Sequence, residues 1–185
     1  MALPSTRFQY SLTLSHVDRG VEASQSLIAA RHPSETAEHL TLRVLAWCLL
    51  YQEGIQFGAG LSDPDAPDLV ANDLTGRVKL WVECGTADPE KLRKAMQHNT
   101  GAAVHAVFSG TRRRDEMLKE VAEWKRVVKG FDAIELWTVD PALVEELARN
   151  EERRQKWAVT VVGDHLYLEV DGKSVDGAVE RSRAT

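Results

Sequence analysis

Alternation between apolar and polar residues predicts a pair of strands near the beginning of the chain. In the first strand, every second residue is apolar, which is typical of a strand with one buried face: Phe8, Tyr10, Leu12 and Leu14. The tetrapeptide 17–20, Val-Asp-Arg-Gly, is typical of a turn. Residues 21–30 are therefore expected to return as the second strand.

The middle of the chain changes between helical and extended patterns. A helix is predicted from its N-cap, Ser34, to about Tyr51, because apolar residues recur at helical spacing and Gly54 follows. The next segments are predicted as three strands, a helix and a buried strand: 55–58, 68–73, 77–84, 89–99 and 102–108. From the first helix onward, the element order is therefore α-β-β-β-α-β.

The remaining chain continues this alternation, and its length suits a single domain. The predicted elements are a helix, a strand, a short helix and the two strands of a hairpin: 112–128, 133–139, 141 onward, 157–162 and 166–170. With 185 residues, of which 43% are hydrophobic, the chain can build one sizeable core. Residues 1–185 are therefore expected to form one domain.

The hairpin formed by the second and third strands of the middle region places two acidic residues side by side. If Thr75-Gly76 is its two-residue loop, Asp68 lies opposite Glu83. The same register places Asn72 opposite Lys79. Directly opposed residues share one face, with Cβ atoms about 4.5–5.5 Å apart. The other face is apolar, which is typical of a sheet packed on a core: Leu69, Ala71, Val78, Leu80, Val82 and Cys84.

Two carboxylates this close repel each other unless a positive charge or a proton lies near them. A divalent cation, a shared proton or a basic neighbour would each neutralise Asp68 and Glu83. Oxygen ligands of this kind suit Mg²⁺ or Mn²⁺, which activate water and stabilise charge on a phosphodiester. The pair therefore predicts a Mg²⁺ or Mn²⁺ site. The alternative is that both acids lie on a solvated sheet face without a ligand.

Several motifs resemble those of known bacterial proteins. Pro67-Asp68, followed after fourteen residues by Glu83 within the α-β-β-β-α-β order, resembles the PD-(D/E)XK nuclease superfamily. More specifically, four stretches resemble the YaeQ family of small bacterial proteins: 30–36, 45–47, 80–85 and 89–95. The resemblance implies an α/β (α+β mixed sheet) protein with a restriction-endonuclease-like αβββαβ core. An N-terminal strand pair and a C-terminal hairpin would be added to this core.

The resemblance also implies which residues form a catalytic site. Asp68 and Glu83 correspond to two acidic metal ligands, and the backbone carbonyl of Cys84 is a candidate further ligand. Glu38, on the first helix, corresponds to an additional acid that many superfamily members carry there. Glu35 competes for this role, but helix capping explains an acid in the first turn of the predicted helix.

The sequence departs from the superfamily pattern at Gly85, where the pattern has a lysine two residues after the second acid. Such a lysine orients the attacking water or stabilises negative charge. The following helix offers Lys91 and Lys94, and the resemblance implies Lys94 as the catalytic substitute. The alternative is that Lys94 is a solvated surface residue, because it lies nearly opposite the predicted core face of the helix: Leu92, Ala95 and Met96.

Charge limits the partners. The net charge of −5 excludes a strongly basic, non-specific DNA-binding surface, although not a local basic groove. The run Arg112–Arg114 is either a phosphate contact or a solvated turn neutralised by Asp115 and Glu116, and the second interpretation is preferred. Nucleic acid is the partner that the resemblance implies, and no protein partner is indicated.

Cysteine and histidine positions argue against disulfide or zinc sites. Cys48 and Cys84 lie in apolar runs without a CxxC motif, and the six histidines lack zinc-site spacing. Neither a signal-peptide pattern nor a membrane-spanning apolar run is found, so a cytoplasmic location without a membrane partner is expected. Three functions stay open: a metal-dependent nuclease, a catalytically inactive nuclease-fold module for binding or regulation, and, less favoured, an enzyme of another class that uses the same carboxylates on a small phosphate ester. Gly85 and the acidic net charge favour the second.

Overall fold

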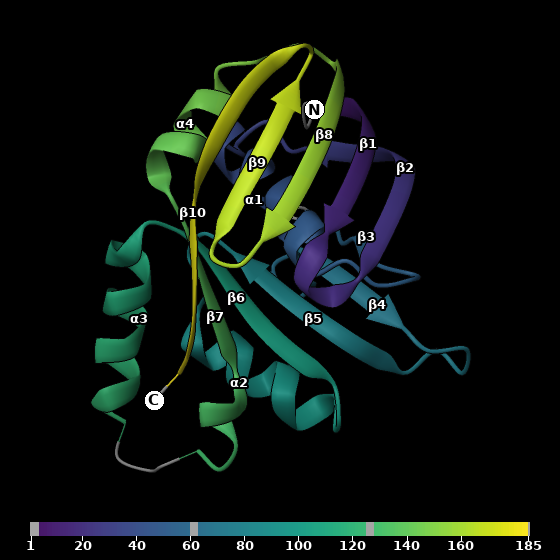
Figure 1. The fold of residues 1–185 in the computed structure, drawn as a ribbon. Coiled ribbons are helices and arrows are strands. Elements are labelled where there is room, and N and C mark those ends of the chain that lie inside the picture. Colours follow the sequence, from purple (N-terminus) through teal and green to yellow (C-terminus); the bar gives the residue numbers. More distant parts are fainter. Residues whose placement is uncertain (1–3, 60–62, 125–127, 185) are drawn as a thin grey trace.

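Strands from both ends of the chain belong to a single ten-stranded mixed sheet (Figure 1). The structure is a computed structural model that describes residues 4–59, 63–124 and 128–184. The strands are β1 (Thr6–His16), β2 (Val21–Arg31), β3 (Gln56–Phe57), β4 (Leu69–Asn72), β5 (Val78–Cys84), β6 (Ala103–Ser109), β7 (Glu135–Val139), β8 (Arg154–Val162), β9 (His165–Val170) and β10 (Lys173–Arg183). They lie in the order β2-β1-β8-β9-β10-β7-β6-β5-β4-β3.

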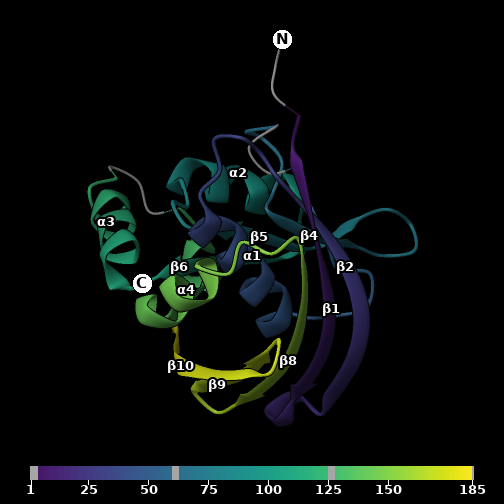
Figure 2. The ribbon, with the colours of Figure 1, turned by 90° about the horizontal axis from the view of Figure 1, so that it is seen from above.

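Four α-helices lie among the described residues: α1 (Ala37–Leu49), α2 (Pro89–His98), α3 (Thr111–Ala122) and α4 (Pro141–Ala148). The sheet curls around α1 (Figure 2), which contacts strands from both halves of the sheet, including β1, β2, β5 and β6. Because α1 is enclosed in this way, every residue from Leu40 to Leu49 is buried. An enclosed helix is apolar on all sides, so the buried polar residues Thr41 and Arg43 stand out.

Two hydrophobic clusters lie on opposite faces of the central strands. The larger cluster fills the inside of the curled sheet around α1 and includes Trp47 and Trp157. The smaller cluster lies beneath α2 and α3 and includes Leu92 and Phe108. Strand β6 contributes Val107 to the first cluster and Phe108 to the second, so it is apolar on both faces. The prediction of a buried strand in this part of the chain is therefore confirmed.

The expected fold class is wrong. Instead of a small restriction-endonuclease-like αβββαβ core with additions, the described residues form a nearly closed, barrel-like mixed sheet of ten strands with four α-helices. Strand β1 pairs in parallel with β8, and β10 pairs antiparallel with β7, so the terminal strands form half of the sheet. Local hydrophobic patterns cannot specify the pairing of β1 with β8, because most of the chain separates them. Strand β10 is largely polar and is not predicted at all.

The hairpin of β4 and β5 keeps the predicted register near its open end but not near its turn. Val70 pairs with Trp81, as predicted. A bulge then places Asn72 opposite Val78 rather than Lys79. The error stays on the turn side of the bulge, so it does not affect the neighbourhood of the two acids.

The turn of this hairpin is longer than the predicted Thr75-Gly76 loop. The backbone N–H of Gly76 donates to the carbonyl of Asp73 (2.9 Å), and the N–H of Asp73 donates to the carbonyl of Arg77 (2.8 Å). Gly76 has a φ of +83°, a left-handed conformation that glycine adopts without steric cost. A turn followed by a left-handed glycine and a bulge is a common three-residue hairpin connection.

Two predicted helices have different bounds in the structure. The N-cap of α1 is Thr36 rather than Ser34, because the Thr36 side chain accepts a hydrogen bond (3.1 Å) from a backbone N–H in the first turn. The helix predicted over 112–128 ends at Ala122, and residues 125–127 of that prediction lie outside the described residues.

Both cysteines, Cys48 and Cys84, are buried free thiols, as the sequence predicts. Burial raises the pKa of each thiol above its usual value. In the part of the chain that the structure describes, we find no helix with the length and apolar character needed to cross a membrane.

Candidate functional site

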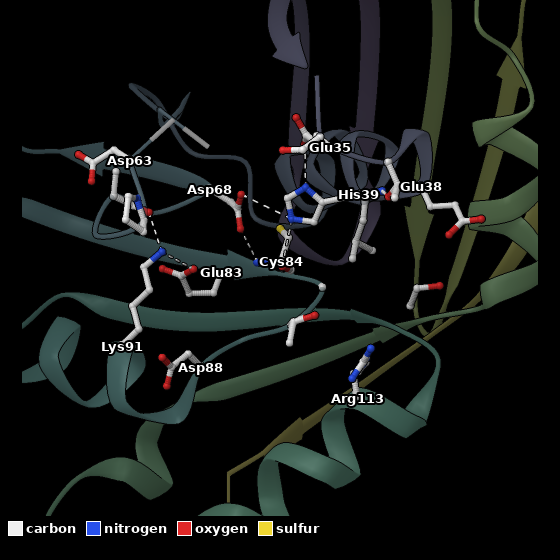
Figure 3. Close-up of a pocket in the computed structure, with 18 of the residues that line it drawn as sticks. Glu35, Glu38, His39, Asp63, Asp68, Glu83, Cys84, Asp88, Lys91 and Arg113 are labelled. Atoms are coloured by element: carbon white, nitrogen blue, oxygen red, sulfur yellow. Dashed lines mark hydrogen bonds and ion pairs between the residues drawn. The ribbon is translucent and has the colours of Figure 1, made fainter. Parts of the chain in front are cut away.

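A polar cavity of about 660 Å³ opens where five elements meet (Figure 3). The beginning of α1 forms one wall, and the start of α2 forms another. The adjoining ends of β4 and β5 form the floor, and the beginning of α3 contributes to the rim. Of the residues that the sequence assigns to a site, Glu38, Asp68 and Glu83 line this cavity, whereas Lys94 does not.

Asp68 lies directly before β4 and turns its carboxylate toward the cavity. Its own N–H donates to the carbonyl of Val82 (2.9 Å), which continues the hairpin pairing. One carboxylate oxygen, Oδ2, accepts the backbone N–H of Cys84 (2.8 Å). The other oxygen, Oδ1, lies 3.6 Å from Nε of Arg43 and 3.7 Å from Nε2 of His39. Asp68 thus has one oxygen fixed by the backbone and one that faces basic side chains.

Glu83, on β5, lies beside Asp68 on the cavity floor (Figure 3). Its Oε1 accepts a hydrogen bond from the indole N–H of Trp81 (2.7 Å), and its Oε2 accepts one from the ammonium group of Lys91 (2.9 Å). Burial raises the pKa of Glu83 to about 7, although Lys91 opposes this shift and Asp68 adds to it. Burial therefore outweighs the stabilisation that Lys91 gives to the ionised form of Glu83, and a further cation beside the carboxylate would stabilise that form.

Lys91 supplies the positive charge that Gly85 cannot. Its side chain extends from α2 to Glu83 and also donates to the carbonyl of Ala66 (2.7 Å). Lys94, one turn along α2, is exposed. Gly85 has a φ of +79°, and a Cβ at this position would lie 3.0 Å from the ring of His39. The structure therefore places Lys91, rather than Lys94, next to the second acid.

A buried polar group at the beginning of α1, made by Glu35 just before the helix and by His39 and Arg43 on it, forms the wall opposite Lys91. Glu35 accepts hydrogen bonds from Nδ1 of His39 (2.7 Å) and from the guanidinium of Arg43 (3.1 Å). Nε2 of His39 lies 3.2 Å from the backbone carbonyl of Cys84. His39 therefore connects the buried Glu35 to the two strands that carry the acids.

In this group, burial and the neighbouring charged groups shift the pKa values in opposite directions. Burial opposes ionisation of Glu35, but the hydrogen bond from His39 and the charge of Arg43 outweigh it and lower the pKa of Glu35. Burial also lowers the pKa of His39. The hydrogen bond to Glu35 and the negative charge of Asp68 outweigh this effect, so the pKa of His39 is raised.

Glu38 and Glu35 occupy positions opposite to those that helix periodicity suggests. Glu38 is exposed at the rim and extends away from Asp68 (Figure 3), whereas the Glu35 side chain is buried. The reason is that α1 begins at Ala37, so Glu35 precedes the helix and turns inward instead of capping it.

Sequence reasoning missed His39 and Arg43, and it set Glu35 aside. The signal that could have found them is their spacing, because Glu35, His39 and Arg43 follow one another at intervals of four residues. Positions four apart lie on one face of a helix. Charged residues repeated along an otherwise apolar helix indicate a buried polar group.

Arginines at the start of α3 line the other side of the cavity mouth. Arg112 and Arg113 both contribute to the rim, and both are more than 40% exposed in their side chains. Glu116 lies 2.9 Å from Arg113 and 3.9 Å from Arg112. Arg114 points elsewhere and pairs with Glu180. Two of the three arginines are therefore near the cavity, and a nearby acid partly neutralises them.

The donor set determines what kind of cation the cavity could hold. Among the described residues, no three side chains of histidine, cysteine, aspartate or glutamate converge in a metal-binding arrangement. A cation would therefore depend on fewer side chains, supplemented by backbone oxygen, water or substrate oxygen. Mg²⁺ is commonly bound in this manner, through one or two carboxylates plus waters and phosphate. Asp68 and Glu83 fit that requirement.

Comparison with known proteins gives one consistent result. The family model described as YaeQ protein matches residues 1–179. Two proteins named "Uncharacterized protein YaeQ", from Escherichia coli (strain K12) and Salmonella typhi, are each 30% identical to this chain. The matches cover 95% and 91% of this chain, and 94% and 90% of the respective relatives.

Two crystal structures of YaeQ proteins are similar over the full fold. The structure from Xanthomonas axonopodis pv. citri has a TM-score of 0.86 and 29% identity, and the match covers 98% of this chain and 99% of that one. The structure from Pseudomonas syringae has a TM-score of 0.81 and 30% identity, with 100% and 98% coverage. The ten-stranded architecture is therefore similar to that of these crystal structures.

Proposed function

The chain belongs to the YaeQ family, and from this premise we propose that its cavity hydrolyses nucleic-acid phosphodiester bonds with the help of Mg²⁺ or Mn²⁺. The proposal treats the cavity as a variant of the PD-(D/E)XK nuclease site. One observation carries it: Asp68, directly before β4, and Glu83, on β5, lie side by side, with the Lys91 ammonium 2.9 Å from Glu83. Two acids and a lysine are the groups that such chemistry needs.

The proposed roles follow from the positions of the side chains. Asp68 and Glu83 would hold the cation, which when bound polarises a phosphate oxygen and lowers the pKa of water. Lys91, fixed by Ala66 and Glu83, would orient the attacking water or stabilise charge on the phosphorane-like transition state. Arg112 and Arg113 at the rim would contact neighbouring phosphates of the strand.

The test is an assay with single- and double-stranded DNA and RNA, with Mg²⁺ or Mn²⁺ added to metal-free protein. Asp68→Asn and Glu83→Gln each remove one negative charge with little change in shape. We expect each to lower the rate by about 10²-fold or more, since a bound metal contributes several kcal/mol. Equal activity in the wild type and in both variants would contradict the proposal.

Two lysines on α2 provide a matched comparison. Lys91→Met removes the ammonium beside Glu83, and we expect it to lower the rate by about 10²- to 10³-fold. Lys94→Met changes an exposed lysine of the same helix and should leave the rate unchanged. If Lys94→Met caused the larger loss, the assignment of Lys91 would be wrong.

A second candidate function is a binding or regulatory module without catalysis. It is favoured by the hydrogen bonds that the acids already make: Cys84 N–H satisfies one oxygen of Asp68, while Trp81 and Lys91 satisfy Glu83. Carboxylates paired in this way need no cation. Calorimetric titration with Mg²⁺ and Mn²⁺ separates the two functions, because the inactive module predicts no binding of either ion.

A further inference from the structure

Three electronegative atoms meet at the wall of the cavity formed by the first turn of α1. They are Nε2 of His39, Oδ1 of Asp68 and the backbone carbonyl oxygen of Cys84. Nε2 lies 3.7 Å from the carboxylate oxygen and 3.2 Å from the carbonyl oxygen. Lone pairs that converge at these distances require a positive centre among them, which is either a proton on Nε2 or a metal ion.

The second ring nitrogen of His39 already has a partner. Nδ1 lies 2.7 Å from Oε1 of Glu35, whose side chain is only 1% exposed and is also paired with Arg43. A buried carboxylate at Nδ1 fixes the ring and assigns the Nδ1 proton, so that Nε2 of the neutral ring faces the cavity as an acceptor. Histidines that bind metals are typically held in this way by a carboxylate at the other nitrogen.

The separations of Nε2 from the two oxygens suit a shared ion. Ligands about 2.1 Å from a metal are about 3.0 Å apart at octahedral angles and about 3.4 Å apart at tetrahedral angles. The separation of 3.2 Å between Nε2 and the carbonyl oxygen lies within this range, and the separation of 3.7 Å between Nε2 and the carboxylate oxygen lies slightly above it. Gly85 keeps the space beside the ring free, because a Cβ there would lie 3.0 Å from Cδ2 of His39.

The charges around the cavity also favour the binding of a cation. Glu35, Asp68 and Glu83, when ionised, carry three negative charges, and Arg43 and Lys91 carry two positive ones. The group therefore has a net negative charge when His39 is neutral. A divalent ion beside Asp68 would reverse this imbalance and would replace the proton that Nε2 otherwise needs.

We propose that His39 is a nitrogen ligand of the cation in this cavity, together with Asp68 and the Cys84 carbonyl, and that Glu35 is its positioning residue. This inference rests on the proposed function, which supplies the cation. It adds a consequence for metal choice, because an imidazole ligand favours Mn²⁺ and other transition metals over Mg²⁺. The site should therefore bind Mn²⁺ more tightly than Mg²⁺, which oxygen ligands alone do not require.

The experiment uses MnCl₂ and the full-length chain, with no nucleic acid present. Continuous-wave EPR of free Mn²⁺ measures binding, and pulsed EPR of the bound ion detects coupling to directly ligated nitrogen. Protein labelled with ¹⁵N-histidine identifies the nitrogen as imidazole. Of the histidines in the described residues, His39 is the one that lines the cavity.

The matched variants are His39→Gln and His32→Gln. His32 precedes α1, contacts Ser34 and does not line the cavity. We expect nitrogen coupling in the wild type, its change on ¹⁵N labelling, its persistence in His32→Gln and its loss in His39→Gln. Mn²⁺ affinity should fall by about tenfold or more in His39→Gln, with a smaller change for Mg²⁺.

The outcomes separate this inference from the proposed function. Bound Mn²⁺ without nitrogen coupling in the wild type overturns the ligand role of His39 and leaves the carboxylate site standing. Absence of Mn²⁺ binding overturns both. If His39→Gln does not fold, the labelled wild-type spectrum decides alone, because imidazole coupling either is present or is absent.

Discussion

This protein contains two histidine–glutamate pairs that differ in whether a ring nitrogen of the histidine faces a cavity. In the first pair, His39 lies 2.7 Å from Glu35 at the cavity wall; in the second, His105 on β6 lies 3.4 Å from Glu135 on β7. Both histidine rings are largely removed from solvent. The pKa of His39 is nevertheless raised, whereas the pKa of His105 is lowered to about 4.

The surroundings of the second pair explain the difference. Burial lowers the pKa of His105; Glu135 opposes this shift, whereas Arg181, which is paired with the same carboxylate, adds to it. The indole N–H of Trp137 donates to Nδ1 of His105 (3.2 Å), so this nitrogen must keep its lone pair. Arg181 also lies over the ring of Trp137. The second pair is therefore closed by its neighbours and acts in packing.

In the first pair, the outer ring nitrogen of the histidine faces the cavity. Glu35 satisfies Nδ1 of His39, while Nε2 faces the cavity and two further acceptors, Asp68 and the Cys84 carbonyl. A histidine beside a glutamate is therefore available for chemistry when its outer nitrogen faces acceptors in a cavity. In the second pair, the donor Trp137 occupies Nδ1, the nitrogen that also lies near Glu135, and the histidine is structural instead.

The largest expected effect in this comparison comes from removing the two glutamates. Glu35→Ala leaves the buried charge of Arg43 without its closest partner, and breaking a buried pair costs about 3–5 kcal/mol of unfolding free energy. Glu135→Ala removes a partner of the exposed Arg181, so we expect a loss of about 1 kcal/mol or less. Urea unfolding measures both. Equal losses would show that the first pair is not the more tightly integrated one.

The next effect is a pH dependence assigned to His105, which is faced by Glu135, Arg181 and Arg19. Its pKa is lower in the folded state than the usual 6.5, so the unfolded chain binds more protons between pH 6.5 and about 4. Stability therefore rises with pH across this window and falls on acidification, by roughly 2–3 kcal/mol from this group.

The matched variant for this prediction is His105→Gln, in which an amide oxygen can still accept the Trp137 N–H. Its unfolding free energy should depend less steeply on pH than that of the wild type between pH 4 and 6.5. Carboxylates that titrate in the same range contribute equally to both proteins and cancel. The same slope in both proteins would contradict the account of a closed, neutral His105.

The smallest effect concerns the space beside His39. Gly85 and Gly101 both have left-handed backbones, with φ values of +79° and +85°, but only at Gly85 would a Cβ meet a neighbour, the His39 ring. Replacement by alanine should cost about 1 kcal/mol at each position for the backbone alone. Gly85→Ala should cost more and should shift the NMR signals of His39 but not of His105. Equal costs and unchanged His39 signals would show that the ring is not held tightly.

The candidate site could be predicted where local patterns determine it. The apolar face of the β4–β5 hairpin fixes the register at Val70 and Trp81, and this register brings Asp68 next to Glu83. A bulge nearer the turn changes the pairing of Asn72, yet it leaves the site end of the hairpin untouched. Alternation of apolar residues therefore suffices for the two acids, even though the turn was predicted wrongly.

The rest of the site depends on contacts between distant segments. Helix periodicity alone does not show that the Lys91 side chain contacts Ala66 and Glu83. The sequence therefore does not decide between Lys91 and Lys94 as the lysine of the site. Glu35 is buried because Arg43 attracts it from two turns along α1.

The ten-stranded sheet also depends on contacts between segments that are far apart in the sequence. It depends on the parallel pairing of β1 with β8 and the antiparallel pairing of β10 with β7, which no local pattern encodes. Individual strands were therefore predicted more successfully than their assembly.

We propose above that the cavity between α1, α2 and the β4–β5 hairpin binds a divalent cation. The most direct measurement is a crystal structure of the full chain with Mn²⁺, collected at a wavelength at which manganese scatters anomalously. The account predicts an anomalous peak within ligand distance of Asp68, with His39 and the Cys84 carbonyl beside it. A cavity without such a peak, at Mn²⁺ concentrations well above those needed to saturate a functional site, would contradict it.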